Sequence, residues 1–296
     1  MGSSRDHDFT QESPGEAPGD QRRQASTRIN RRPPIRWAGG KRLLANRLRQ
    51  FLPAKYGSYY EPMVGSGALF FSIAPEQAYL ADINPELMNF YHVLKNHPKS
   101  LYSAISSFAA EEATYYSLRA WTPAGRLERA ARFLYLVRLS WNGLYRVNRY
   151  GHFNVPYGYR RPKELLSWER MQAASLALRN AHFGCGDFEI TTVSIRPGDL
   201  LYLDPPYPKG AAKGNGFARY NETGFTLEDH MRLARWVSHL ANRGVHILIT
   251  EAARKEILAL FPKDFRLTLV RSSSLIAADS GSRRDAYEAI LTSYPV

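Results

Sequence analysis

The sequence predicts an α/β fold, in which buried strands alternate with helices, and three observations support this prediction. Residues 59–71 contain a short strand, a glycine turn and a helix, and residues 78–82 form a second strand that ends in Asp82. A third apolar strand, at 199–203, ends in Asp204. A glycine turn followed by a strand ending in an acid is typical of nucleotide-binding folds, although a plain turn with a capping acid is the alternative.

Length and cysteine content exclude several classes of protein. The chain has 296 residues, which suits one large domain or two small ones with a core that needs no disulfides. Its single cysteine, Cys185, excludes an internal disulfide framework and a cysteine-rich zinc site. No run of about 18 uncharged apolar residues occurs, and no apolar signal region follows the first charges. We therefore expect a cytoplasmic protein that is neither exported by a Sec signal nor membrane-spanning.

The basic charge is concentrated in one part of the chain. The formal net charge is +13, and residues 87–170 hold 13 basic and 5 acidic side chains together with 16 aromatic ones. A basic, aromatic-rich segment suits a polyanion surface on which bases can stack, although a charged helical face with a core of rings would have the same composition. The composition therefore divides the chain into four segments, residues 1–32, 33–86, 87–170 and 171–296.

Residues 1–32 are rich in Ser, Gly, Gln, Pro and both charges, with few large apolar side chains. Such a segment buries too little surface to offset its ordering entropy, so it is predicted to be a disordered tail. Arg31 and Arg32 at its end are candidates for phosphate contact.

The first motif is Ile-Arg-Trp-Ala-Gly-Gly-Lys at 35–41, followed by helical periodicity over 43–52. A glycine pair and Lys41 at the start of a helix offer N–H groups and a cation to an anionic group. The motif is not a P-loop, because Arg42 stands where Ser or Thr should follow the lysine and the upstream glycine is missing.

The strongest motif is Asp204-Pro205-Pro206-Tyr207. Because proline has no N–H, this turn presents carbonyl oxygens without competing donors. Asp204 and the carbonyl of Pro205 can therefore accept hydrogen bonds from an amino group, while Tyr207 stacks on the ring that bears it. A tight turn without a function is the alternative.

The remaining elements follow from local signals. Thr226 and Asp229 form a capping box for a helix that runs to about Arg243, and a further helix is predicted at 167–180. The apolar segments at 245–250, 265–271 and 286–294 are predicted strands. Residues 141–158 interleave glycines, amides, arginines and rings, which is poor core material but suits the reading of base edges.

These motifs, taken in order, resemble one family. With Trp37 through Lys41, Glu61-Pro62 through Gly67, residues 81–84 and residues 204–207 in that order, the chain resembles the Dam-type (D12 class, α group) DNA adenine-N6 methyltransferases. The resemblance covers roughly residues 33–294. It implies a Rossmann-like S-adenosylmethionine-dependent methyltransferase sheet, formed by a catalytic domain of residues 33–86 and 171–296. It also implies an inserted, mainly helical target-recognition domain at 87–170.

The resemblance also implies roles for individual residues. The implied catalytic residues are Asp204, Pro205, Pro206 and Tyr207. The residues implied to contact S-adenosylmethionine are Trp37, Lys41, Gly65, Gly67, Asp82 and Asp204. The residues implied to contact DNA are Arg36, Asn142 and Arg146. No metal is required, because the sulfonium of the cofactor supplies the electrophile, and Cys185 is expected to have no role.

The implied reaction transfers a methyl group from S-adenosylmethionine to N6 of an adenine flipped out of duplex DNA, with GATC as the expected target. We expect a monomer or weak dimer, bacterial or phage-encoded and associated with the nucleoid, and leave open whether a cognate restriction endonuclease exists. A cytosine-N4 methyltransferase more often has Ser at the position of Asp204, and a protein-glutamine methyltransferase usually has Asn there. An RNA methyltransferase is disfavoured because the basic insert suits a duplex. A catalytically silent DNA-binding regulator is the alternative from another class.

Overall fold

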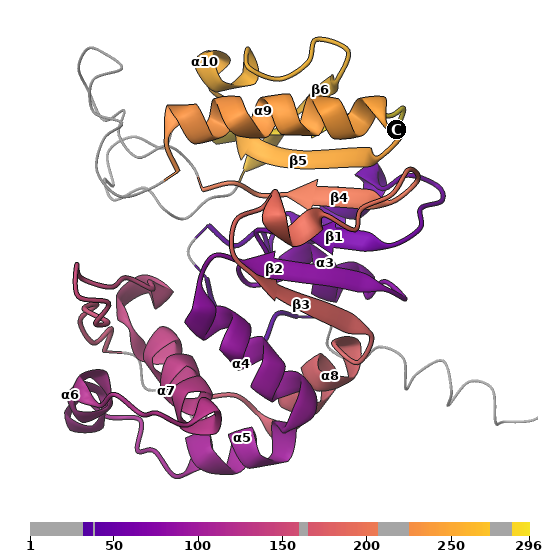
Figure 1. The fold of residues 1–296 in the computed structure, drawn as a ribbon. Coiled ribbons are helices and arrows are strands. Elements are labelled where there is room, and N and C mark those ends of the chain that lie inside the picture. The colour runs from indigo at the N-terminus through magenta and orange to yellow at the C-terminus, as the bar shows by residue number, and fades with distance from the viewer. Residues whose placement is uncertain (1–31, 38, 160–164, 207–224, 273–285) are drawn as a thin grey trace, which may run out of the picture. The chain divides into compact units, whose positions relative to one another are not determined.

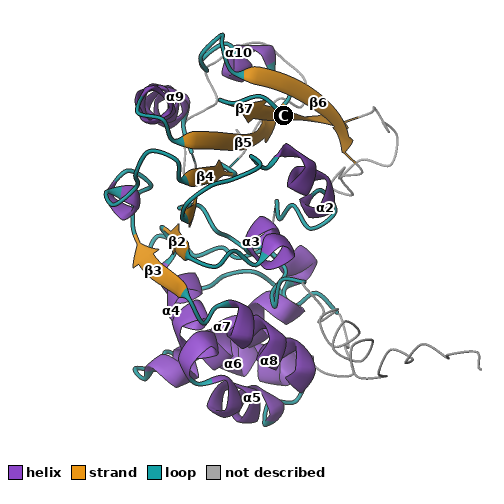
Figure 2. Cartoon of the chain, turned by 90° about the vertical axis from the view of Figure 1, so that its right-hand side faces the viewer, coloured by secondary structure: helices purple, strands orange, loops and turns teal. Residues whose placement is uncertain are grey.

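The computed structural model describes residues 32–37, 39–159, 165–206, 225–272 and 286–296, which belong to one compact unit. The described strands form one seven-stranded sheet with helices on both faces, α9 on one face and α3 on the other (Figures 1 and 2). The strands are β1 (Tyr59–Glu61), β2 (Ala78–Asp82), β3 (Ala181–Cys185), β4 (Leu200–Leu203), β5 (His246–Ala252), β6 (Arg266–Ser272) and β7 (Ala286–Thr292).

The strand order is β3-β2-β1-β4-β5-β7-β6. The first five strands of this order run parallel, and β7 lies antiparallel between β5 and β6. Because the chain moves from β1 to β2 in one direction and later to β4 in the other, the carboxyl ends on either side of β1 form a crevice. This order confirms the predicted α/β, Rossmann-like fold.

Twelve helical segments are described. They are α2 (Ala45–Leu48), η1 (Arg49–Phe51), α3 (Ala68–Ile73), α4 (Pro85–Asn96), α5 (Pro98–Ser106), α6 (Glu112–Ala120), α7 (Arg126–Leu139), η2 (Trp141–Gly143), α8 (Trp168–Ala177), η3 (Ile190–Thr192), α9 (Leu227–Asn242) and α10 (Lys255–Leu258). Helices α4 to α8 lie together beyond β3, and α4 contacts β2, β3 and α7 (Figure 1). Among the described residues, no helix is long and apolar enough to cross a membrane.

The core has one apolar layer on each face of the sheet. Leu200 and Tyr202 of β4 belong to one cluster of buried side chains, and Leu201 and Leu203 belong to the other. All four are fully or nearly fully buried, which explains why this strand reads as an apolar run without alternation. The predicted capping box is confirmed, because Thr226 accepts from the N–H of Asp229 and the Asp229 carboxylate accepts from the N–H of Thr226.

One interpretation of the insert needs correction. Residues 141–158 were expected to be poor core material, but Phe153, Val155 and Tyr157 are at most 5% exposed. They alternate along an irregular hairpin closed by bridges between Ser140 and Tyr157 and between Val147 and Phe153. The period of two was visible in the sequence, and the tip of the hairpin, residues 146–152, is exposed.

A buried pair joins α9 to β5. The side chains of His230 and Glu251 are fully buried, with Nε2 3.2 Å from Oε2, and Nδ1 lies 2.9 Å from the carbonyl oxygen of Thr226. Because a carbonyl only accepts, Nδ1 carries a proton. Burial lowers the pKa of His230, but the hydrogen bonds to Glu251 and Thr226 raise it more, so the net shift is upward.

This upward shift predicts a pH dependence of stability. A raised pKa in the folded state gives stability that is fully present below the unfolded value of about 6.5 and is lost as the pH rises through the folded pKa. We expect the free energy of unfolding, measured in urea, to fall across that window. His230→Gln should be less stable and should have a flatter pH profile, whereas His239→Gln, an exposed position on the same helix, should retain the wild-type slope. Equal slopes in all three proteins would contradict this prediction.

Candidate functional site

A cavity of about 680 Å³ lies at the carboxyl edge of the parallel strands. This volume is within the usual range for small-molecule sites, about 300–1,000 Å³. The cavity is lined by residues at the ends of four strands, by the segment that carries Lys41, by Phe225 and the first turns of α9, and by Tyr145. The lining residues are Trp37, Gly39, Gly40, Lys41, Glu61, Pro62, Met63, Val64, Gly65, Ser66, Ala68, Asp82, Ile83, Asn84, Tyr145, Gly186, Asp187, Phe188, Tyr202, Asp204, Pro205, Pro206, Phe225, Asp229 and Arg232. Every described residue predicted to be catalytic or to bind the cofactor, except Gly67, is in this set.

The glycine turn after β1 has little space around it. Gly65 and Gly67 have φ of +46° and +65°, in the left-handed region that favours glycine. A Cβ on Gly65 would lie 2.8 Å from Cδ1 of Trp37. The carbonyl of Gly65 accepts a hydrogen bond of 2.8 Å from the hydroxyl of Tyr91. The turn is therefore fixed by its backbone conformation and by its contacts on two sides.

Asp82 joins the glycine turn to the end of β2. Its Oδ2 accepts from the N–H of Gly65 at 3.0 Å, and its Oδ1 accepts from the N–H of Asn84 at 3.0 Å. Burial raises the pKa of Asp82 and outweighs these backbone hydrogen bonds, which lower it. The structure thus brings together the two parts of the nucleotide-binding motif that the sequence predicted.

Lys41 and Asp204 form an ion pair across the cavity wall. Nζ of Lys41 lies 2.7 Å from Oδ1 of Asp204, and the two side chains are 6% and 18% exposed. The hydroxyl of Thr250 donates to the same Oδ1 at 2.9 Å. Oδ2 of Asp204 has no hydrogen-bond partner among the described residues, so this oxygen is the one available to a ligand.

Trp37 connects the cavity to the insert. Its ring stacks on Tyr145, with centroids 5.7 Å apart and an interplanar angle of 23°, and both side chains line the cavity. The insert therefore supplies part of the cavity wall.

Sequence reasoning did not assign a role to Glu61, although this residue lines the cavity. Glu61 is 2% exposed and accepts a hydrogen bond of 2.8 Å from the hydroxyl of Tyr59. Burial, aided by the charge of Asp204, raises the pKa of Glu61 to about 8 despite the hydrogen bond from Tyr59, which lowers it. Its place at the end of β1 was the available signal, since Asp82 and Asp204 were found in the same way.

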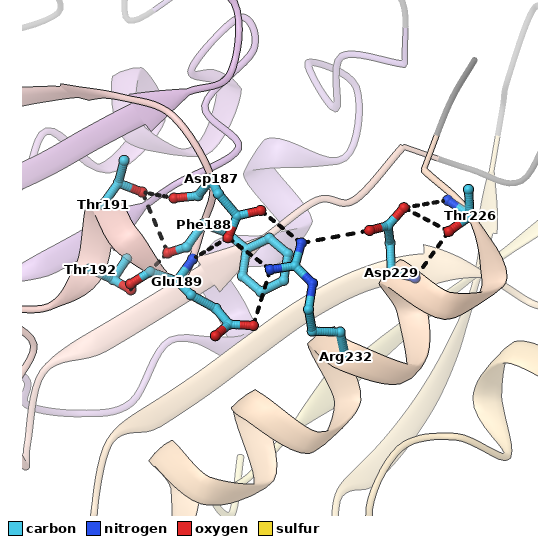
Figure 3. A network of polar contacts seen from close by, with 8 residues as sticks. All are labelled: Asp187, Phe188, Glu189, Thr191, Thr192, Thr226, Asp229 and Arg232. Carbon is cyan, nitrogen blue, oxygen red and sulfur yellow. Dashed lines mark hydrogen bonds and ion pairs between the residues drawn. The ribbon is translucent and has the colours of Figure 1, made fainter.

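Asp187 and Phe188 were also missed, and a network with Arg232 of α9 holds them (Figure 3). Nη1 and Nη2 of Arg232 lie 2.9 and 2.7 Å from Oδ1 and Oδ2 of Asp187, and the guanidinium lies 4.3 Å from the centroid of the Phe188 ring. The hydrogen bonds from Arg232 lower the pKa of Asp187, so its side chain remains a carboxylate. Arg232 also contacts Glu189 at 3.1 Å and Asp229 at 3.6 Å.

The residues predicted to contact DNA are on the surface. Arg36, Asn142 and Arg146 are all exposed. Cβ of Arg36 lies 3.2 Å from the position that a Cβ on Gly143 would take, so Arg36 packs against the turn that carries Asn142. Nε of Arg146 donates to Oδ1 of Asn154 at 2.7 Å. Tyr207 lies outside the described residues.

Known proteins match most of this chain. The profile of the family described as D12 class N6 adenine-specific DNA methyltransferase matches residues 37–272. The Type II methyltransferase M1.LlaDCHI of Lactococcus lactis subsp. cremoris is 36% identical, over 90% of this chain and 97% of its own. The Type II methyltransferase M.MjaIII of Methanocaldococcus jannaschii is 31% identical, over 89% of this chain and 99% of its own length. The DNA adenine methylase of Escherichia coli K12 is 30% identical, over 86% of this chain and 92% of its own length.

The close approach at the glycine turn predicts the effect of Gly65→Ala. The added methyl group would meet the Trp37 ring in a backbone conformation that alanine disfavours. We expect the free energy of unfolding to fall by about 2–3 kcal/mol in urea denaturation.

Gly151→Ala provides the matched control, because φ there is +79° and no atom lies within 4 Å of the added Cβ. We expect its free energy of unfolding to fall by about 1 kcal/mol, which is the effect of backbone strain alone. Equal losses in the two variants would mean that Trp37 does not restrict the turn.

Proposed function

The chain belongs to the D12 class of N6 adenine-specific DNA methyltransferases, and from this premise we propose that its cavity holds S-adenosylmethionine beside an adenine flipped out of duplex DNA. The observation that carries the proposal is that Asp82, Asp204 and the glycine turn, far apart in the sequence, line one cavity of suitable volume. Flipping is needed because N6 is not open to in-line attack inside a duplex.

The cavity has the groups that an adenosyl sulfonium compound requires. Asp82 binds the ribose hydroxyls, and the Gly65–Gly67 turn leaves room beside them. Asp187 accepts from the amino group of the cofactor adenine, because an ionised carboxylate can only accept, and the ring of Phe188 packs on the base. Trp37 and Lys41 complete the wall. The cofactor supplies an electrophilic methyl group on a cationic sulfur.

The chemistry at the target base depends on Asp204. The lone pair of N6 is delocalised into the ring, so this nitrogen is a weak nucleophile. Oδ2 of Asp204 and the carbonyl of Pro205 accept from the two N–H bonds, which favours a pyramidal nitrogen and stabilises the charge that develops on it. The N–CH₃ bond forms as the bond between sulfur and the methyl group breaks, which would leave a neutral thioether. One N–H proton then leaves to solvent. Lys41 and Thr250 hold Oδ1, so the carboxylate does not have to reorient.

Recognition of DNA is assigned to the insert, residues 87–170, with its excess of basic side chains. Arg36, Asn142 and Arg146 are the proposed contacts to bases or phosphates, and stacking of the flipped adenine on Tyr207 completes the proposal. GATC is the proposed target sequence, and a monomer or weak dimer is the proposed active form. The name Type II methyltransferase, carried by two relatives, supports a search for a cognate restriction endonuclease.

The role of Asp204 predicts that Asp204→Ala separates chemistry from binding. We expect the single-turnover rate of methyl transfer to fall by at least about 100-fold, since an interaction made with the developing charge is lost. The dissociation constant for duplex DNA should change by no more than a few-fold. The measurements are transfer of a labelled methyl group and fluorescence anisotropy. A variant with a rate near that of the wild type would refute the mechanism.

The contacts of Arg232 predict a positioning role for this residue. We expect Arg232→Ala to raise the KM for S-adenosylmethionine about tenfold, with kcat within about twofold, because Asp187 and Phe188 lose the group that orients them. Arg232→Lys should recover only part of the loss, since lysine cannot form the bidentate pair. Arg235→Ala, exposed on the same helix, is the control and should have no effect. A lower kcat with an unchanged KM would contradict this role.

A further inference from the structure

A second, smaller cavity of about 320 Å³ adjoins the first. Ala68 lines both cavities, and the consecutive residues Lys41 and Arg42 line one each. Three arginines, Arg32, Arg42 and Arg49, lie around the second cavity, which we call the arginine groove. The sequence had singled out Arg42 only as the residue that excludes a P-loop, and the proposed mechanism does not use it.

The arginine groove has an excess of positive charge that the described residues do not neutralise. All three arginines are exposed, and none forms an ion pair or hydrogen bond with any other described residue. Residues 32–60 contain seven basic side chains and no acidic one. The first acid that follows, Glu61, is buried and lines the other cavity. Three like charges around one small hollow repel one another, so the arrangement is suited to an anion.

The groove is held in place by the fold. The carbonyl of Pro33 accepts a hydrogen bond of 3.1 Å from Arg170 of α8, which fixes the backbone next to Arg32. Arg42 directly follows Lys41, which the ion pair with Asp204 fixes. Arg49 directly follows Leu48, the last residue of α2, and the side chain of Leu48 is fully buried. The three guanidinium groups therefore project from anchored backbone.

The guanidinium chemistry and the location favour phosphate as the anion. Arginine presents a planar set of donors that matches phosphate oxygens, and contacts to the DNA backbone supply affinity without sequence information. The groove shares a residue with the cavity in which the target adenine is placed. We propose that the arginine groove binds a phosphate of the DNA backbone outside the target base pair. This inference rests on the proposed function for the identity of the partner.

The double variant Arg42→Ala/Arg49→Ala tests the proposal. Its affinity for a duplex of about 24 base pairs is measured by fluorescence anisotropy between 50 and 200 mM salt. Each lost phosphate contact lowers the slope of log K against log[salt] by about 0.9, so we expect the slope to fall by about 1–2 and the affinity to fall about tenfold at low salt. The value of kcat at saturating DNA should stay within twofold.

Arg47→Ala is the matched control. Arg47 is an exposed residue of α2, between Arg42 and Arg49 in the sequence, but it does not line the groove. It should leave the slope and the affinity close to those of the wild type. If Arg47→Ala weakens binding as much per charge as the double variant does, the effect is one of net charge and the inference is overturned.

Two further measurements identify the source of the phosphate. On a duplex of about eight base pairs centred on the target, the double variant should bind like the wild type, because the outer phosphate is missing. Inorganic phosphate at millimolar concentration, at constant ionic strength, should weaken binding of the long duplex by the wild type by only a small factor. The inference is overturned if the wild type binds inorganic phosphate at the groove while the double variant binds the long duplex as tightly as the wild type does. Absence of methyl transfer by the wild type would refute the proposed function instead.

Discussion

The ion pair between Lys41 and Asp204 is the interaction on which the rest of the site depends. Both groups are largely buried, and a buried charge without a partner costs several kcal/mol, so the pair stabilises both charges. Lys41 also lies 4.0 Å from Glu288, which supplies a second, weaker contact. Because Lys41 lies near the start of the described chain and Asp204 ends β4, the pair fixes the N-terminal segment across the carboxyl edge of the sheet. That segment carries Trp37, whose ring lies against Gly65 and stacks on Tyr145 of the insert.

The sheet brings four acids to this edge, and each has a different partner. Glu61 accepts a hydrogen bond from a tyrosine hydroxyl, and Asp82 accepts from backbone N–H groups. Asp187 pairs with a guanidinium group, and Asp204 pairs with an ammonium group. Unpaired carboxylates this close would raise one another's pKa, so the separate partners allow each acid a separate role. The strand order explains the arrangement, because the acids lie at or just after the ends of four neighbouring parallel strands.

Local signals predicted much of this structure. The apolar run at 78–82 predicted both ends of β2. The spacing of Thr226 and Asp229 predicted the capping box of α9. β3 was missed because it is an edge strand with only one fully buried residue, so its sequence lacks a clear apolar pattern, and Asp187 was missed with it. The pairing of Lys41 with Asp204 could not be predicted, because it depends on which strands become neighbours. The period-two pattern in the insert was present but was obscured by its glycines and arginines.

The most direct test of the account is nucleoside analysis and methylation-sensitive sequencing of DNA from a host that lacks adenine methylation and expresses this chain. The account predicts N6-methyladenine at every copy of one short sequence. DNA that contains N4-methylcytosine, or that is protected without any added methyl group, would contradict it.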